Sequence, residues 1–240
     1  MLELFAGIGG LSLGLERAGL HVVGQVEIDP WCRTVLERHW PGVPRHDDVR
    51  TALAWWLNED RPRVDVVAGG YPCQPESAAG RGLSIEDARW LWPEMARIVH
   101  ALRPRWVIGE NVGGHRTRGL RFVLRDLERL GYTATPGTVR ACEVGAPHAR
   151  ERLFTLAYTN RIGGRPGLRQ EDTWEQAARV AFTHAGDSVG WPAEPPFSRM
   201  ADGLPHRMDR RRGLGNAVVP AVAEHIGRIV TEADRRIYGE

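Results

Sequence analysis

The sequence contains no lysine, and all 32 of its basic side chains are arginine. Its three cysteines, Cys32, Cys73 and Cys142, are far apart and form no C-x-x-C pair, which argues against both a disulfide framework and a structural zinc site. No apolar run approaches the roughly 18 residues that cross a bilayer, and the N-terminal stretch lacks the charged region of a signal peptide. We therefore expect a cytoplasmic protein that uses no membrane and no metal.

The charge balance is equally uninformative, since a formal net charge of +2 does not by itself indicate a polyanionic partner. Genome base composition is the simplest reason for using arginine alone. The guanidinium groups are nevertheless available for bidentate contacts with phosphate and guanine.

A chain of 240 residues with 42% hydrophobic residues is long enough to bury one sizeable core. Its first 158 residues alternate between aliphatic runs and amphipathic stretches. The runs predict buried parallel strands at 2–5, 21–27, 64–69, 105–110 and 152–158. The stretches between them predict helices at 10–18, 31–39, 49–58, 88–102 and 117–130.

Strands that alternate with helices predict an α/β fold with an open, doubly wound sheet. The pattern changes near Thr159, where a segment rich in Gly, Pro and Arg follows. We expect a main domain over 1–158, a small irregular region over 159–198, and a C-terminal segment over 199–240. That last segment contains a helix with an apolar face at about 218–230.

A glycine turn follows the first predicted strand, with Gly7, Gly9 and Gly10 ahead of a helix. Such a turn lets the backbone approach a ligand, and Glu27, twenty residues after Gly7, stands where an acidic side chain binds a ribose diol. The pattern indicates a nucleoside-containing cofactor. Because Ser12 replaces the third glycine of G-x-G-x-x-G, a nicotinamide dinucleotide is less favoured.

Two aspartates follow the second helix, and they leave two interpretations open. Asp47 and Asp48 could reach the adenine edge of a bound cofactor. One of them could equally be the N-cap of the helix that starts at Val49.

Three later positions are candidates for chemistry. Cys73 lies in a Gly- and Pro-rich turn at the carboxyl end of the strand 64–69, where ligands bind in open α/β sheets, although an isolated cysteine is more often structural. Glu110 ends the next strand, and a carboxylate at that depth should have a raised pKa and can donate a proton. Arg150 and Arg152, two residues apart, should share one face of a strand.

In this order, the motifs FAGIGG, VEIDP, GGYPCQ, GENV, APHARER and GLGNAVVP resemble those of DNA cytosine C5-methyltransferases, above all the compact phage and prophage type. The resemblance spans Leu2 to about Arg228, apart from 159–198. It implies a class I, Rossmann-like S-adenosylmethionine-dependent methyltransferase that acts on double-stranded DNA as a monomer, in the cytoplasm of a bacterium or of a phage-infected host. Many such enzymes belong to restriction-modification systems.

The resemblance also assigns roles to residues. Cys73 would be the nucleophile that attacks C6 of cytosine, Glu110 would engage N3, and Arg152 would bind the base oxygen with support from Arg150. The residues implied to bind S-adenosylmethionine are Phe5, Ala6, Gly7, Gly9, Glu27, Ile28, Asp48, Val49, Pro72, Asn216 and Val218. Those implied to face the target base or DNA are Gln74, Ser77, Asn111, His148, Arg210, Arg211 and Arg212.

The chemistry requires these residue types. A thiolate must add to C6 before C5 becomes nucleophilic, and the charge that develops on the ring needs stabilising groups. The target base must also leave the stacked duplex. Residues 159–198, with the arginine-rich stretch 206–213, take the position of a target-recognition region.

Two positions depart from the family pattern: His148 stands where glutamine is common, and Glu76 where an aromatic or aliphatic residue is common. A non-catalytic homologue that binds DNA or the cofactor, and a relative that modifies cytosine in RNA, are the alternatives.

Overall fold

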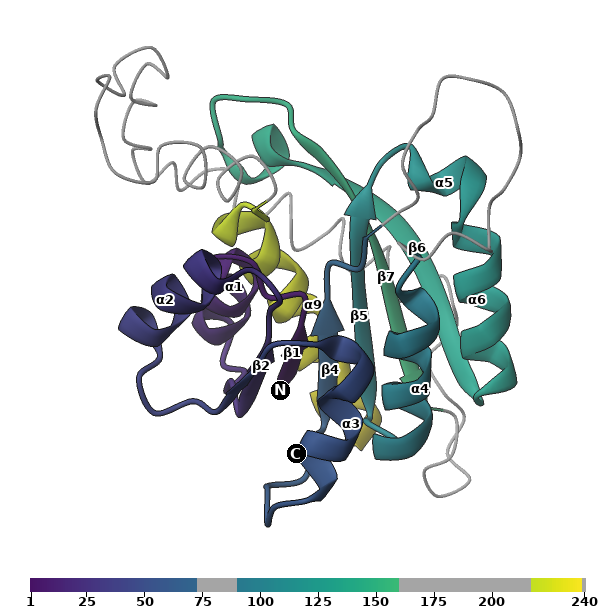
Figure 1. Cartoon of the computed structure of the whole chain (residues 1–240). Helices are drawn as coiled ribbons and strands as arrows, with labels where there is room; N and C mark the ends of the chain where they lie inside the picture. The colour runs from purple at the N-terminus through teal and green to yellow at the C-terminus, as the bar shows by residue number, and fades with distance from the viewer. Residues whose placement is uncertain (73–89, 160–216, 239–240) are drawn as a thin grey trace, which may run out of the picture.

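The computed structural model describes residues 1–72, 90–159 and 217–238. These residues form a seven-stranded sheet in the order β3-β2-β1-β4-β5-β7-β6 (Figure 1). The strands are β1 (Leu2–Leu4), β2 (Gly24–Val26), β3 (Arg45–His46), β4 (Val66–Gly69), β5 (Trp106–Val112), β6 (Tyr132–Arg140) and β7 (Glu151–Thr159).

The strands from β3 to β5 are parallel to their neighbours, which confirms the expected doubly wound, mostly parallel α/β sheet. Three of the five aliphatic runs contain β1, β2 and β4, the run 105–110 covers most of β5, and the run 152–158 lies within β7. Two strands were not predicted. β3 has only two residues, and β6 contains Pro136 and Gly137, which weaken the strand pattern.

The expectation that 152–158 is a parallel strand is wrong. β7 is antiparallel to β5, with Arg152 opposite Val112 and Tyr158 opposite Trp106, and β6 is antiparallel to β7. A parallel β7 would have placed Arg152 at the other end of β5, roughly 20 Å away at about 3.3 Å per residue. The reversed direction instead places Arg152 at the carboxyl end of the parallel strands.

The helices connect the strands as expected, with shifts at their ends. Their bounds are α1 (Gly10–Arg17), α2 (Pro30–His39), α3 (Val49–Leu57), α4 (Trp92–Leu102), α5 (His115–Arg118), α6 (Leu120–Arg129) and α9 (Pro220–Tyr238), with a 3-10 helix η1 (Ala141–Val144). α4 starts at Trp92, later than expected, because Pro93 suits the first helical turn. The predicted helix 117–130 is divided at Gly119 into α5 and α6.

Alternating side chains of the strands pack against helices on both faces of the sheet. On β5, Trp106 and Ile108 join the core formed with α1 and α9, while Val107 faces the core formed with α3, α4 and α6. In Figure 1, α9 lies behind the sheet, and α3 and α4 lie in front of it. This two-sided burial is typical of a doubly wound sheet.

Helix α9 packs closely on α1, although more than 200 residues separate their starts. A Cβ on Gly14 would lie 2.2 Å from the carbonyl oxygen of Pro220, so glycine is needed for this contact. Trp106 Nε1 donates to Asp234 Oδ1 at 2.8 Å and fastens α9 to β5. The chain ahead of α9 is thereby held against the glycine turn. None of the helices in the described ranges is long and apolar enough to cross a membrane.

Candidate active site

The glycine turn between β1 and α1 has the conformation that its sequence predicts. Gly7 and Gly9 adopt φ values of 55° and 85°. A Cβ on Gly10 would lie 2.3 Å from the carbonyl oxygen of Val218, so the turn touches the segment ahead of α9. Phe5 also has a positive φ of 58°, which is strained for an aromatic residue and is typical of functional sites.

Glu27 stands directly beneath this turn at the end of β2. Its Oε2 accepts a hydrogen bond from the Gly7 backbone N–H at 2.6 Å, and its Oε1 accepts one from the Asp29 N–H at 2.8 Å. The carboxylate therefore joins the turn to the start of α2. Its position, twenty residues after Gly7, matches the predicted place of a group that binds ribose hydroxyls.

At the far end of the same cleft, Asp48 is the N-cap of α3. Its Oδ1 accepts from the Arg50 backbone N–H at 2.9 Å and lies 3.4 Å from Arg50 Nη1. The N-cap interpretation is therefore correct for Asp48. Asp47 and Val49 line the cleft beside it, and Ile28 is 66% exposed there.

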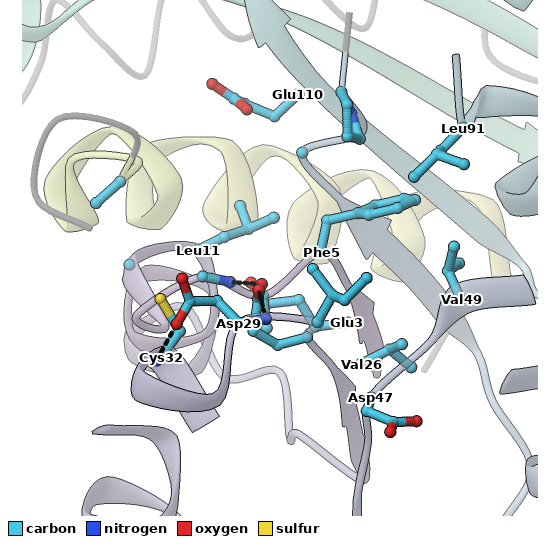
Figure 2. Close-up of a pocket in the computed structure, with 18 of the residues that line it drawn as sticks. Glu3, Phe5, Leu11, Val26, Asp29, Cys32, Asp47, Val49, Leu91 and Glu110 are labelled. Carbon is cyan, nitrogen blue, oxygen red and sulfur yellow. Dashed lines mark hydrogen bonds between the residues drawn. The ribbon is translucent and has the colours of Figure 1, made fainter. Parts of the chain in front are cut away.

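These elements surround a pocket of about 280 Å³. In Figure 2, Phe5 lies between Glu110 at one end of the pocket and Asp47 at the other. Of the described residues that line it, one is arginine, Arg50, and six carry carboxyl groups: Glu3, Glu27, Asp29, Asp47, Asp48 and Glu110. Burial raises the pKa of Glu3 to about 8 and that of Glu110 to about 7, so these two carboxyl groups can be neutral near neutral pH. The other four still outnumber the one arginine, and this excess favours a cationic ligand.

The lining also contains most of the positions implied to bind the cofactor. It includes Phe5, Ala6, Gly7, Glu27, Ile28, Asp48, Val49, Pro72 and Val218. Gly9 is the N-cap of α1, beside the lining, and a Cβ there would lie 2.4 Å from the Trp40 ring.

Glu110 lines the pocket beside Gly70 and there pairs with Arg152. Arg152 Nε lies 2.9 Å from Glu110 Oε1, and the two side chains are only 14% and 9% exposed. Burial raises the pKa of the Glu110 carboxyl to about 7, and the Arg152 guanidinium opposes that rise. Near neutral pH the carboxyl can therefore donate or accept a proton.

The chain that leads from β4 passes directly over this carboxyl group. A Cβ on Gly70 would lie 2.7 Å from Glu110 Oε2, so a side chain there would require the Glu110 carboxyl group to move. Asn111, the next residue of β5, donates from Nδ2 to the carbonyl oxygen of Tyr71 at 2.9 Å, and its Oδ1 accepts from the Val112 N–H. Asn111 is thus buried inside the protein, where it holds the chain two residues before Cys73.

Arg150 and His148 lie on the segment that precedes β7. Arg150 Nη1 donates to the carbonyl oxygen of Ala217 at 3.3 Å, which links this segment to the approach to α9. His148 Nδ1 accepts from the Arg150 backbone N–H at 3.4 Å. Arg150 therefore contacts the wall of the pocket, whereas Arg152 contacts Glu110.

Sequence analysis missed Glu3, which lies on the pocket floor. Its side chain is buried in β1, and burial raises its pKa to about 8. Ser12 Oγ donates to Glu3 Oε2, and Gln25 Nε2 donates to Ser12 Oγ at 3.1 Å. The signal was a single carboxyl residue within an otherwise apolar strand run, which must face either a partner or a ligand.

Several predicted site residues lie outside the described residues: Cys73, Gln74, Glu76, Ser77, Arg210, Arg211, Arg212 and Asn216. The same applies to the expected target-recognition region at 160–198 and the chain that follows it to residue 216. Among the residues the structure does describe, no group of three or more His, Cys, Asp or Glu side chains could hold a metal ion.

The family model described as C-5 cytosine-specific DNA methylase matches residues 1–184. The Type II methyltransferase M.NgoBI of Neisseria gonorrhoeae is 34% identical over 166 residues, which are 67% of this chain and 51% of that protein. The Type II methyltransferase M.Eco47II of Escherichia coli is 38% identical over 170 residues, 68% of this chain and 40% of that protein.

The chain thus spans about half the length, or less, of the curated relatives it matches. Among solved structures, a prophage-encoded Escherichia coli protein described as a DNA modification methyltransferase superposes with a TM-score of 0.67. It is 19% identical, and the match covers 97% of this chain and 98% of that chain. At this identity the likeness concerns the fold.

Proposed function

Because this chain belongs to the family of C-5 cytosine-specific DNA methylases, we propose that it transfers a methyl group from S-adenosylmethionine to C5 of a cytosine in double-stranded DNA. The observation that carries the proposal is the pair of Glu110 and Arg152, whose side chains meet at one end of an acidic pocket. The pocket would hold the cofactor, and the pair would hold the base beside Cys73.

The pocket fits this cofactor by charge and by shape. S-adenosylmethionine carries a sulfonium cation, which suits a lining where, even with Glu3 and Glu110 protonated, four carboxyl groups face one arginine among the described residues. Glu27 would bind the ribose hydroxyls, as acidic residues at this place in dinucleotide folds do. The apolar side chains of Phe5, Ile28 and Leu91 would contact the adenine. A dinucleotide with two phosphates suits this lining poorly.

The protein's own residues would then activate the base. The cofactor supplies an electrophilic methyl group for C5. The Cys73 thiolate adds to C6, while protonated Glu110 donates its proton to N3 and Arg152 stabilises the base oxygen. A base then removes the C5 proton, the Cys73–C6 bond breaks, and the N3 proton returns to Glu110. A pKa of about 7 suits a carboxyl group that must donate and regain a proton.

The proposed partner of the protein is double-stranded DNA. Residues 159–198 and the arginine stretch 206–213 would contact DNA phosphates and read the target sequence after the base is flipped from the duplex. The protein would act as a monomer in the cytoplasm of a bacterial or phage-infected cell, with or without a cognate restriction enzyme.

A methyl-transfer assay tests this proposal. Purified protein should move radiolabelled methyl groups from S-adenosylmethionine to duplex DNA, and the product should be 5-methylcytosine. Cys73→Ala should abolish transfer and still bind the cofactor, because Cys73 is needed only for the chemistry on the base. Bisulfite sequencing of DNA from cells that express the protein would give the target sequence.

Two controls separate the alternatives. RNA of the same sequence should accept no label; preferential labelling of RNA would favour the RNA-modifying alternative. DNA with 5-fluorocytosine should form a gel-stable covalent complex, because that base has no C5 proton to lose. Undiminished transfer by Cys73→Ala would contradict the covalent mechanism, and cofactor binding without any transfer would favour a non-catalytic homologue.

A further inference from the structure

An aromatic cluster lies beside the pocket, formed by Tyr71, Trp90, Trp92 and His115. All four side chains are at most 8% exposed. The Tyr71 ring lies 6.0 Å from Trp90, 5.1 Å from Trp92 and 5.4 Å from His115, measured between ring centroids. The cluster therefore joins Tyr71 to Trp90 ahead of α4, to Trp92 at the start of α4, and to His115 at the start of α5.

Tyr71 is held at three points. Its hydroxyl group is hydrogen-bonded to His115 Nε2 at 3.1 Å, and its carbonyl oxygen accepts from Asn111 Nδ2 at 2.9 Å. A Cβ on Gly109 would lie 3.2 Å from the Tyr71 ring, so the ring rests on the backbone of β5. Both the side chain and the main chain of Tyr71 are thus fixed to β5 and α5.

The fold leaves a fitted space for the His115 ring. A Cβ on Gly119 would lie 2.0 Å from the His115 ring, so the absence of a side chain at Gly119 is what makes room for the imidazole. Burial lowers the pKa of His115 to about 4, and the ring stays neutral near neutral pH. A neutral imidazole keeps one N–H group and one lone pair, and either can pair with a tyrosine hydroxyl.

The position of Tyr71 bears directly on the catalytic groups. Gly70, its neighbour, lies so close to Glu110 that a Cβ there would be 2.7 Å from Oε2, and Pro72, its other neighbour, lines the pocket. Cys73 follows next in the sequence. A displacement of Tyr71 would move this chain relative to Glu110, and displacements of about 1 Å near reacting groups cost up to ~100-fold in rate.

We propose that His115 and Tyr71 are positioning residues for the reaction. Their buried hydrogen bond fixes the chain at 70–72 against Glu110 and thereby sets the position from which the chain continues into Cys73. The proposal rests on the proposed function. It treats the hydroxyl–imidazole bond as a device for placing the nucleophile, beyond its contribution to the hydrophobic core.

The test removes one hydroxyl group from each of two buried tyrosines. Tyr71→Phe removes the bond to His115. Tyr132→Phe is the matched control, because Tyr132 is also buried and its hydroxyl donates to the Pro104 carbonyl at 2.7 Å. Tyr132 pairs with Thr159, at the end of the strands opposite to Arg152 and the pocket. We expect Tyr71→Phe to lower the single-turnover methyl-transfer rate about tenfold with the KM for DNA and the cofactor affinity unchanged. Tyr132→Phe should keep the parent rate.

A pair of His115 variants sharpens the result. His115→Gln places an amide near the position of Nε2 and can still pair with the Tyr71 hydroxyl, whereas His115→Leu cannot. We expect His115→Gln to keep most of the rate and His115→Leu to lose about as much as Tyr71→Phe. Equal losses in the two variants, or an equal loss in Tyr71→Phe and Tyr132→Phe, would overturn the positioning role.

A second measurement does not depend on activity. The alkylation rate of Cys73 by iodoacetamide is compared with that of Cys142, which is exposed and free and serves as an internal standard. Tyr71→Phe and His115→Leu should change the ratio of the two rates at least about threefold, while Tyr132→Phe leaves it unchanged. An unchanged ratio would overturn the inference. A parent protein that transfers no methyl group would instead overturn the proposed function, and the ratio would still decide the positioning role.

Discussion

The parallel and antiparallel parts of the sheet contribute to the site in different ways. Strands β1, β2, β3 and β4 have two to four residues each, and the groups they bring to the pocket lie mostly in the turns after them. Strands β5 and β7 have seven and nine residues, and they bring Glu110 and Arg152 from within the ladder itself. In the proposed function, the parallel part would therefore provide a cofactor site built from turns, and the antiparallel part a base site built from strands.

The difference has a physical cause. Parallel strands end at one edge of the sheet, so only their turns reach a ligand there. An antiparallel strand starts at that same edge, and its first side chains face the cleft with the rigidity of a hydrogen-bonded ladder. A proton donor and its guanidinium partner need such rigidity, whereas a cofactor can be held by backbone turns.

The largest expected effect on the methyl-transfer rate comes from a substitution in the antiparallel part of the site. Arg152→Ala should lower the methyl-transfer rate by about 1,000-fold, because it removes a stabilising charge and leaves Glu110 buried without its partner. Cofactor affinity, measured by calorimetry, should stay within about twofold of the parent. A comparable loss of cofactor affinity would show that the two parts of the site are not separate.

A substitution in the parallel part of the site should impair cofactor binding and leave the chemistry on the base intact. Glu27→Gln should weaken cofactor binding by about 10- to 100-fold, since the side chain loses one acceptor for the Gly7 turn and the ribose. The covalent complex with 5-fluorocytosine DNA should still form once the cofactor is saturating. Glu16→Gln is the control, because Glu16 is also a carboxylate but accepts from Trp40 outside the pocket lining. Its cofactor affinity should match the parent.

The smallest expected effect is the pH dependence of the methyl-transfer rate, which should arise in the antiparallel part of the site. The reaction needs Glu110 protonated, and its pKa of about 7 means that the protonated fraction falls as pH rises. The reaction also needs the Cys73 thiolate, so the thiolate fraction, measured from the pH dependence of Cys73 alkylation, is divided out of the rate. The corrected single-turnover rate should drop about fivefold between pH 7 and pH 8 and level off toward acid. With saturating cofactor, Glu27→Gln should show the same profile. A profile that moves with Glu27→Gln would place the titrating group in the cofactor part instead.

Local sequence signals were sufficient for most of the fold. Aliphatic runs and the glycine turn predicted β1, β2, β4 and β5, since buried strands and tight turns depend mainly on nearby residues. β6 escaped prediction because Pro136 and Gly137 interrupt it. The glycine at 119, between α5 and α6, leaves room for the His115 ring, a contact that the local pattern does not reveal. The domain boundaries and the roles of the site residues stay predictions.

The order of motifs in the sequence by itself identified the family, the cofactor turn and the positions of Glu27, Glu110 and Arg152, because each motif is a short run read locally. The raised pKa of Glu110 was also expected, from the place of this residue at the end of a buried strand, and the structure agrees. Only the tertiary structure decided that β7 is antiparallel, that Arg152 meets Glu110, and that burial raises the pKa of Glu3. It also brought Tyr71 to His115. Strand direction, desolvation and pairing across the core depend on distant parts of the chain, so no local pattern could specify them.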